Sequence, residues 1–283
     1  MSEMTANPIG VFDSGIGGLT VVKELFTTVP FEPIVYFGDT ARVPYGSKSV
    51  ETVQRYARED TELLLAQHVK MIVVACNTVS ATALSEVERI ADGIPVIGMI
   101  GPCAEDAVRA TRSGRIGIAG TEATVASGAY ERAIMEEGIR QGKACTAFSV
   151  ACPLFVPLAE EGWTHHPATE LIAKEYLQVV LEHDIDTLIL GCTHYPVLMD
   201  VIQRVAGPGV TLVNSGASAA RRIAAMLKAS SSAGIAPASS FLVSDVPRKF
   251  QQIGARFLGR PMPDVSQVTW RESWVIKKAA TLT

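Results

Sequence analysis

Two stretches of the chain share a pattern that decides the fold: KMIVVACNT at residues 70–78 and DTLILGCTH at residues 186–194. Each begins with a polar residue, continues as an aliphatic run and ends in a cysteine followed by polar side chains. An unbroken aliphatic run is typical of a parallel β-strand that is covered on both faces. The pattern therefore predicts two buried strands, each with a cysteine, Cys76 or Cys192, at its carboxyl end.

A second pair of stretches precedes these two. PIGVFDS at residues 8–14 resembles RIGIAGT at residues 115–121, so each half of the chain has an Ile-Gly strand followed by a strand that ends in Cys. A repeat of this length indicates two similar parallel-sheet α/β domains related by pseudo-twofold symmetry, with an active site in the cleft between them. The alternative is that buried parallel strands resemble one another without any repeat.

Short aliphatic runs alternate with amphipathic segments along most of the chain, which indicates parallel sheets built from βαβ units. The amphipathic pattern is clearest over residues 50–67. The Ser, Ala and Pro-rich residues 228–240 are expected to form a loose connection before one last strand and helix. The predicted strands are Ile9–Phe12, Ile34–Phe37, Met71–Ala75, Pro95–Met99, Arg115–Ala119, Thr146–Val150, Thr187–Gly191, Val210–Val213 and Phe241–Ser244.

The composition narrows the class of protein. A net charge of -4 with scattered Lys and Arg argues against a nucleic-acid partner. No apolar run is long enough for a membrane span, and residues 1–7 do not look like a secretion signal. The five cysteines are odd in number and form no C-x-x-C pair, which argues against a zinc site or a redox dithiol. We therefore expect a cytoplasmic protein with free thiols and no metal.

Ligands of open parallel sheets bind beyond the carboxyl ends of the strands, so the chemistry is sought there. DSGIGG at residues 13–18 ends the first strand, and its glycines expose backbone N–H groups at a helix start near Leu19. The alternative is an ordinary helix-entry turn with Asp13 as its cap. The spacing does not match the dinucleotide-binding fingerprint.

Cys76 and Cys192 are the main catalytic candidates. Asn77 and Thr78 follow the first, and Thr193 and His194 the second, each pair leading into a predicted helix. A helix N-terminus lowers the pKa of a nearby thiol, so both thiols are expected to ionise readily. The other three cysteines are interpreted as packing residues: Cys103, Cys145 and Cys152.

Two readings of the cysteines remain open. One thiolate beside His194 fits acyl transfer with a nucleophile and a base. Two thiols on opposed domains instead fit inversion of a carbon centre, with one thiolate removing a proton from one face and one thiol delivering a proton to the other. This second reaction demands no cofactor.

Two further segments carry polar groups. The PYG turn, Pro44, Tyr45 and Gly46, is flanked by Asp39 and Arg42, and its backbone N–H and hydroxyl groups are suited to a carboxylate; an ordinary loop is equally compatible. Glu160 follows the segment CPLFVP at residues 152–157, and by composition alone it is a solvated surface charge.

Together these motifs closely resemble the glutamate racemases of the cofactor-independent aspartate/glutamate racemase superfamily. The matching pieces occur in family order over roughly residues 8–260: IGVFDSGIGGLT (9–20), YFGDT (36–40), PYG (44–46), VACNT (74–78), CPLFVP (152–157) with Glu160, and LGCTHYP (190–196). Residues from Pro261 onward have no clear counterpart and are expected to form a flexible tail.

The resemblance implies interconversion of L- and D-glutamate without a cofactor, supply of D-glutamate for peptidoglycan, and a homodimer. It implies two α/β domains, the first closed by the C-terminal part of the chain: residues 1–98 plus 211–283, and residues 99–210. Cys192 would take the proton of L-glutamate and Cys76 that of D-glutamate, assisted by Asp13 on the Cys76 side and by His194 with Glu160 on the Cys192 side. The implied substrate contacts are Asp13, Ser14, Pro44, Tyr45, Gly46, Cys76, Asn77, Thr78, Thr121, Cys192, Thr193 and His194.

Three alternatives stay open. A racemase of the same superfamily acting on aspartate or another acidic amino acid differs only in its pocket. Cys–His acyl transfer would need Cys192 without Cys76. A non-enzymatic glutamate-binding protein would bind without exchanging the Cα proton.

Overall fold

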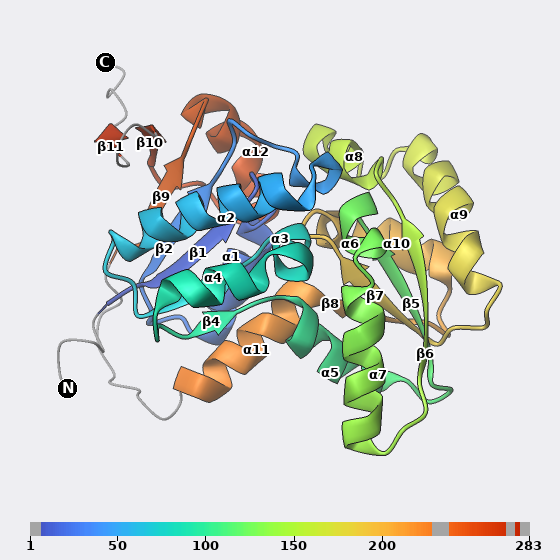
Figure 1. The fold of residues 1–283 in the computed structure, drawn as a ribbon. Helices are drawn as coiled ribbons and strands as arrows, with labels where there is room; N and C mark the ends of the chain where they lie inside the picture. The colour runs from blue at the N-terminus through green and yellow to red at the C-terminus, as the bar shows by residue number, and fades with distance from the viewer. Residues whose placement is uncertain (1–6, 228–237, 270–274, 278–283) are drawn as a thin grey trace.

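The computed structural model describes residues 7–227, 238–269 and 275–277, which form two β-sheets side by side (Figure 1). All neighbouring strands are parallel except β10 and β11, which are antiparallel. The first sheet has the order β11 (Val275–Lys277), β10 (Val265–Thr269), β9 (Ser240–Val243), β2 (Ile34–Gly38), β1 (Ile9–Asp13), β3 (Met71–Val74), β4 (Val96–Ile97). The second has the order β6 (Thr146–Ala151), β5 (Arg115–Gly120), β7 (Thr187–Gly191), β8 (Thr211–Asn214).

The predicted internal repeat is present in the strand order. The series β2-β1-β3-β4 of the first sheet has the same connectivity as β6-β5-β7-β8 of the second. In each sheet the Ile-Gly strand lies directly beside the strand that leads to the cysteine: Ile9 is paired with Met71 and Ile116 with Thr187. The prediction of two similar parallel-sheet domains is therefore confirmed, and we call them the first and the second domain after their sheets.

Helices cover both faces of each sheet (Figure 1). The apolar stripe of α2, with Val53, Ala57 and Leu64, packs on the same face of the first sheet as Phe12 and Ile72. Burying one such side chain contributes about 1.5–3 kcal/mol, so these stripes hold helices and sheets together. The helices are α1 (Leu19–Thr28), α2 (Val50–Leu65), α3 (Asn77–Thr82), α4 (Leu84–Ala91), α5 (Ile100–Ala110), α6 (Glu122–Ala126), α7 (Ala129–Gln141), α8 (Phe155–Glu161), α9 (Pro167–Leu181), α10 (Met199–Ala206), α11 (Ser215–Leu227) and α12 (Pro247–Leu258), with 3-10 turns η1 (Tyr45–Ser47) and η2 (Tyr195–Leu198).

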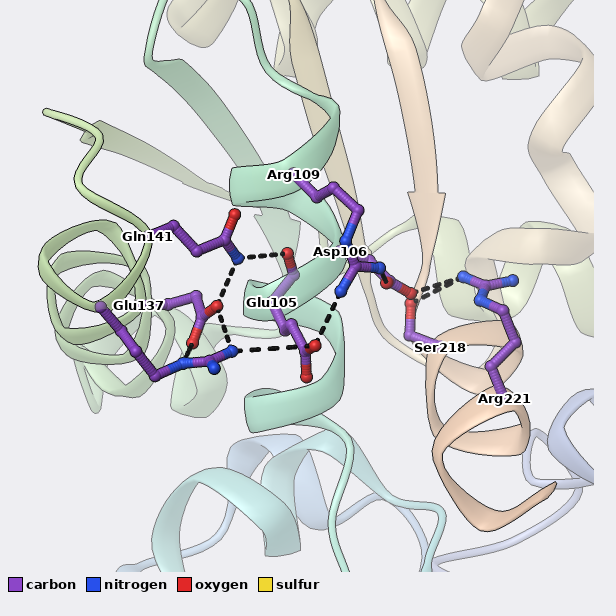
Figure 2. Close-up of polar contacts among 8 residues, drawn as sticks. Glu105, Asp106, Arg109, Glu137, Gln141, Ser218 and Arg221 are labelled. Carbon is purple, nitrogen blue, oxygen red and sulfur yellow. Dashed lines mark hydrogen bonds and ion pairs between the residues drawn. The ribbon is translucent and has the colours of Figure 1, made fainter. Parts of the chain in front are cut away.

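Two helices connect the domains. The chain leaves β4 through Gly98 into α5, and α11 leads from β8 back towards α1 of the first domain. Figure 2 shows that polar side chains tie α5 to both α7 and α11. Asp106 of α5 receives a hydrogen bond of 2.6 Å from Arg221 of α11, and the backbone oxygen of Glu105 receives one of 3.3 Å from Gln141 of α7. The three helices therefore form one frame beside the domain junction.

All nine predicted strands are present, with ends that differ by a few residues. The expectation of a flexible tail after Pro261 is wrong for residues 265–269 and 275–277, which add β10 and β11 to the first sheet. Val265 and Val268 of β10 are buried, and this apolar contact explains why the segment is ordered. Of the predicted connection 228–240, residues 228–237 lie outside the described part of the chain.

The predicted division into residues 1–98 plus 211–283 and residues 99–210 stays a prediction. β8 is paired with β7, so residues 211–214 lie in the second sheet although the predicted boundary assigns them to the first domain. Among the residues that the structure describes, no helix has the length and apolar character of a membrane span.

Candidate active site

A cavity of about 200 Å³ lies where the carboxyl ends of strands from the two sheets face each other. Drug-sized ligands occupy pockets of roughly 300–1,000 Å³, so this one suits a smaller molecule. The first domain contributes Ser14, Val43, Pro44, Tyr45, Gly46, Ser47, Cys76, Asn77 and Thr78 to its wall. The second contributes Thr121, Glu122, Pro153, Val156, Pro157, Cys192, Thr193 and His194.

Cys76 caps the N-terminus of α3, and its side chain is 5% exposed. Burial, and after it the nearby carboxylate of Asp13, raise the pKa of its thiol to about 12, against hydrogen bonds from Val79 and Ser14. The expectation that a helix start lowers this pKa is therefore wrong. α3 is only six residues long, so its dipole does not offset the loss of solvent.

Asp13 lies behind the cavity wall rather than on it. Its carboxylate is fully buried and accepts a 3.0 Å hydrogen bond from the backbone N–H of Gly15 and a 3.5 Å bond from the hydroxyl of Thr193. Burial raises the pKa of Asp13, whereas the positive field of His194 lowers it in part. Asp13 thus links the Cys76 side of the site to the loop that carries Cys192.

Cys192, His194 and Glu160 form a relay on the opposite side. Nδ1 of His194 lies 3.9 Å from Sγ of Cys192, and Nε2 lies 3.0 Å from a carboxylate oxygen of Glu160. Burial disfavours the charged imidazole, but hydrogen bonds to Cys192 and Glu160 outweigh it and raise the pKa of His194 to about 10. The imidazole therefore holds a positive charge next to the sulfur at neutral pH.

Glu160 is not a solvated surface charge, which is what its composition alone had suggested. It lies on α8, outside the cavity wall, and its side chain is 29% exposed. The ring of Phe257 packs edge-on against His194 with the ring centres 5.3 Å apart. These contacts fix the orientation of the imidazole between Glu160 and Cys192.

The PYG turn lies on the cavity wall, but the tyrosine hydroxyl is engaged by other residues. The hydroxyl of Tyr45 donates to the carboxylates of Asp39 and Asp60, the latter at 3.0 Å. Arg42 pairs with both carboxylates and with Glu59. The interpretation that this hydroxyl holds a carboxylate is therefore wrong, because two buried acids already accept from it.

The two domains touch tightly around the cavity. The hydroxyl of Thr20 in α1 donates to the backbone oxygen of Thr193 at 2.8 Å, and the hydroxyls of Thr78 and Thr121 lie 3.0 Å apart. Gly17 is pressed against the second domain, since a Cβ there would lie 2.2 Å from Oγ1 of Thr193. These contacts fix the two domains against each other beside the cavity.

The structure thus brings most of the predicted site residues to one cavity and sets Asp13 and Glu160 behind its wall. Sequence reasoning missed the supporting residues Asp60, Tyr130 and Ser215, which contact Tyr45 or Asn77. No motif marks them, because each comes from a helix far along the chain from its partner. Within the described residues, no group of three or more His, Cys, Asp or Glu side chains is arranged to hold a metal ion.

Known proteins resemble this chain in sequence and in fold. Residues 9–223 match the model of the Asp/Glu/Hydantoin racemase family. A glutamate racemase of Chlorobaculum tepidum is 52% identical over 265 residues, covering 93% of this chain and 96% of the relative. The crystal structure of the Francisella tularensis glutamate racemase in complex with D-glutamate matches with a TM-score of 0.86 at 38% identity, covering 94% and 98% of the two chains. That of the Thermus thermophilus glutamate racemase in complex with β-chloro-D-alanine matches with a TM-score of 0.83 at 42% identity, covering 94% and 98%.

Proposed function

The chain belongs to the Asp/Glu/Hydantoin racemase family, and on that basis we propose that it inverts the α-carbon of glutamate with two cysteines, Cys76 and Cys192. Relatives at about half identity over nearly the whole chain are glutamate racemases, so the enzyme class is an amino-acid racemase, an isomerase. The remaining question is how the site performs the inversion.

One observation carries the two-base mechanism: Cys76 and Cys192 come from different domains and lie on the wall of the same small cavity. Inversion requires a proton to leave one face of the α-carbon and another to arrive on the opposite face. Two groups from opposed domains meet this requirement. A single nucleophile with one base would not need the second thiol.

In the L-to-D direction, the Cys192 thiolate takes the α-proton of L-glutamate and becomes a thiol. The Cys76 thiol then gives its proton to the opposite face of the planar carbanion and becomes a thiolate. The charged imidazole of His194 at 3.9 Å favours the Cys192 thiolate, and the raised pKa of Cys76 keeps its proton in place until it is needed. The reverse reaction starts from the opposite protonation states.

The carbanion is stabilised by polar groups on the cavity wall. Ser14, Asn77, Thr121 and Thr193, which carry hydroxyl or amide groups, line the wall together with the PYG turn. Such groups suit the two carboxylates of glutamate. No step in this sequence calls for a cofactor.

Racemisation of L-glutamate in D₂O tests the mechanism. Two monoprotic thiols place deuterium in the D-product, with little in the L-glutamate recovered early. Equal early labelling of both enantiomers would mean one polyprotic base and would refute the two-cysteine mechanism. Cys76→Ala must abolish racemisation, whereas Cys145→Ala, outside the cavity, must retain it.

The same assays separate the alternatives. Acyl transfer by Cys192 predicts that Cys76→Ser stays active and that a thioester can be trapped. A binding protein predicts tight glutamate binding without exchange of the Cα proton. A higher kcat/KM for aspartate than for glutamate would overturn the substrate assignment.

The proposed cellular role is to supply D-glutamate for peptidoglycan in the cytoplasm, with glutamate as the small-molecule partner and a homodimer as the assembly. Rescue of a D-glutamate-requiring bacterial strain by the gene tests the role. Light scattering of the purified protein tests the dimer, and a monomer mass at micromolar concentration would contradict it.

A further inference from the structure

The side chain of Asn77 is held between a residue of the second domain and a residue of the connecting helix α11. The hydroxyl of Tyr130 in α7 donates to Oδ1 of Asn77 at 2.7 Å, and Nδ2 of Asn77 donates to the hydroxyl of Ser215, at the start of α11, at 3.3 Å. All three residues are at most 2% exposed. Water therefore does not compete for these hydrogen bonds.

The contacts continue to the strand of the second cysteine. The hydroxyl of Ser215 donates to the backbone oxygen of Leu190 in β7 at 3.1 Å. Asn77 directly follows Cys76, and Leu190 lies two residues before Cys192. Two hydrogen bonds through Ser215 thus connect Asn77, next to Cys76, with the strand that leads to Cys192. Tyr130 holds the side-chain amide of Asn77 from the other side.

The helices that carry Tyr130 and Ser215 are held in place by a third helix. α7 and α11, which carry Tyr130 and Ser215, are both tied to α5 by the polar network described above (Figure 2). Asn77 belongs to the first domain, Tyr130 to the second, and Ser215 to α11, one of the two helices that connect the domains. The hydrogen bonds can therefore form only when the domains are as close as they are in this structure.

We propose that Tyr130 is a positioning residue, which with Ser215 fixes Asn77 and thereby the spacing of Cys76 and Cys192 in the closed enzyme. The inference rests on the proposed two-base function. A proton must pass between each sulfur and the α-carbon, and such transfers need the reacting atoms within hydrogen-bond reach. A small change in the spacing of the thiols slows both transfers, whereas Tyr130 and Ser215 are not among the residues that line the cavity, so substrate binding should change less.

Tyr130→Phe tests this role, because it keeps the ring in the core and leaves Oδ1 of Asn77 without its donor. We expect kcat to fall about 10- to 100-fold, with KM for glutamate changed less than threefold. Ser215→Ala removes the other partner and is expected to give the same pattern. Tyr176→Phe, which removes a hydroxyl outside the cavity, is the control and should keep both constants.

The double variant separates positioning from stability. If both residues act through Asn77, the fold-loss in kcat of Tyr130→Phe/Ser215→Ala is well below the product of the two single fold-losses, because the second change removes a contact already loosened. Assays are run below the unfolding transition, with the folded fraction checked by circular dichroism.

Three outcomes would overturn the inference. The kcat of the single variants could be unchanged, the two fold-losses could multiply independently in the double variant, or the loss of kcat could match the unfolded fraction. If the unmodified protein itself fails to racemise glutamate, the proposed function fails instead. If Tyr130→Phe does not fold, the kcat and KM of Ser215→Ala alone decide.

Discussion

The charge on His194 depends on Glu160, and the substitution Glu160→Gln tests this dependence. Glutamine keeps the shape and a hydrogen-bonding group 3.0 Å from Nε2 of the imidazole but removes the negative charge. In the unmodified protein the pKa of His194 is about 10. The imidazole therefore stays charged over the whole physiological range and supports the Cys192 thiolate.

The size of the effect follows from the contact. An opposite charge within hydrogen-bond distance shifts a pKa by roughly 1–3 units, or about 1.4–4 kcal/mol. Because the Glu160 side chain is 29% exposed, solvent screening favours the lower half of that range. The pKa of His194 should therefore be lower in Glu160→Gln. Burial disfavours the charged imidazole, and in this variant the carboxylate of Glu160 no longer offsets that effect.

The assay is the pH dependence of kcat/KM for L-glutamate. We expect its basic limb to move to lower pH by about 1–2 units in Glu160→Gln, because the neutral imidazole no longer stabilises the thiolate. Glu161→Gln removes a charge from the exposed neighbouring residue of α8 and should leave the limb in place. An unshifted limb in Glu160→Gln, or an equal shift in both variants, would refute the assignment of Glu160 as the partner that charges His194.

Three further predictions concern stability and closure. His194 has a pKa raised from 6.5 to about 10 in the folded protein, so its stabilising contribution is complete below pH 6.5 and is lost as the pH rises towards 10; urea titrations at pH 6.5 and 9.5 should show a lower unfolding free energy at the higher pH. Gly17→Ala should lower kcat/KM by about 10- to 100-fold, since its Cβ would lie 2.5 Å from the imidazole of His194, whereas Gly101→Ala, with no atom within 4 Å, should not. Arg42→Met should cost about 3–5 kcal/mol in a denaturant titration, because it leaves the buried carboxylates of Asp39 and Asp60 without an opposite charge. Arg58→Met, at an arginine that is 51% exposed, should cost under about 1 kcal/mol. Equal losses in these two variants would contradict the role of burial.

The strands and the cysteine positions were predictable because they depend on local pattern. The aliphatic runs before Cys76 and Cys192 are long enough to identify buried strands, and the shared order of the two halves places both thiols at one junction. β10 escaped prediction since its sequence, VSQVT at residues 265–269, alternates weakly and has only two buried valines. Its order comes from pairing with β9, which is a non-local contact.

The electrostatics of the site were not predictable in the same way. By composition Glu160 resembles a surface charge, and only the family resemblance linked it to His194. The pKa of Cys76 depends on how completely its surroundings exclude water. The hydroxyl of Tyr45 is taken up by Asp60, an acid fifteen residues further along the chain. Each of these properties arises from partners that only the tertiary fold brings together.

The late strands β10 and β11 have a consequence for handling the protein. Without residues 265–277, β9 would become the outermost strand of the first sheet, with a row of unpaired N–H and C=O groups beside Phe241 and Val243. Such an edge is a template for another chain. A protein cut after residue 260 should therefore keep its catalytic groups yet precipitate on concentration, which makes the C-terminus a poor place for shortening and the outer side of β11 the place to add a solubilising tail.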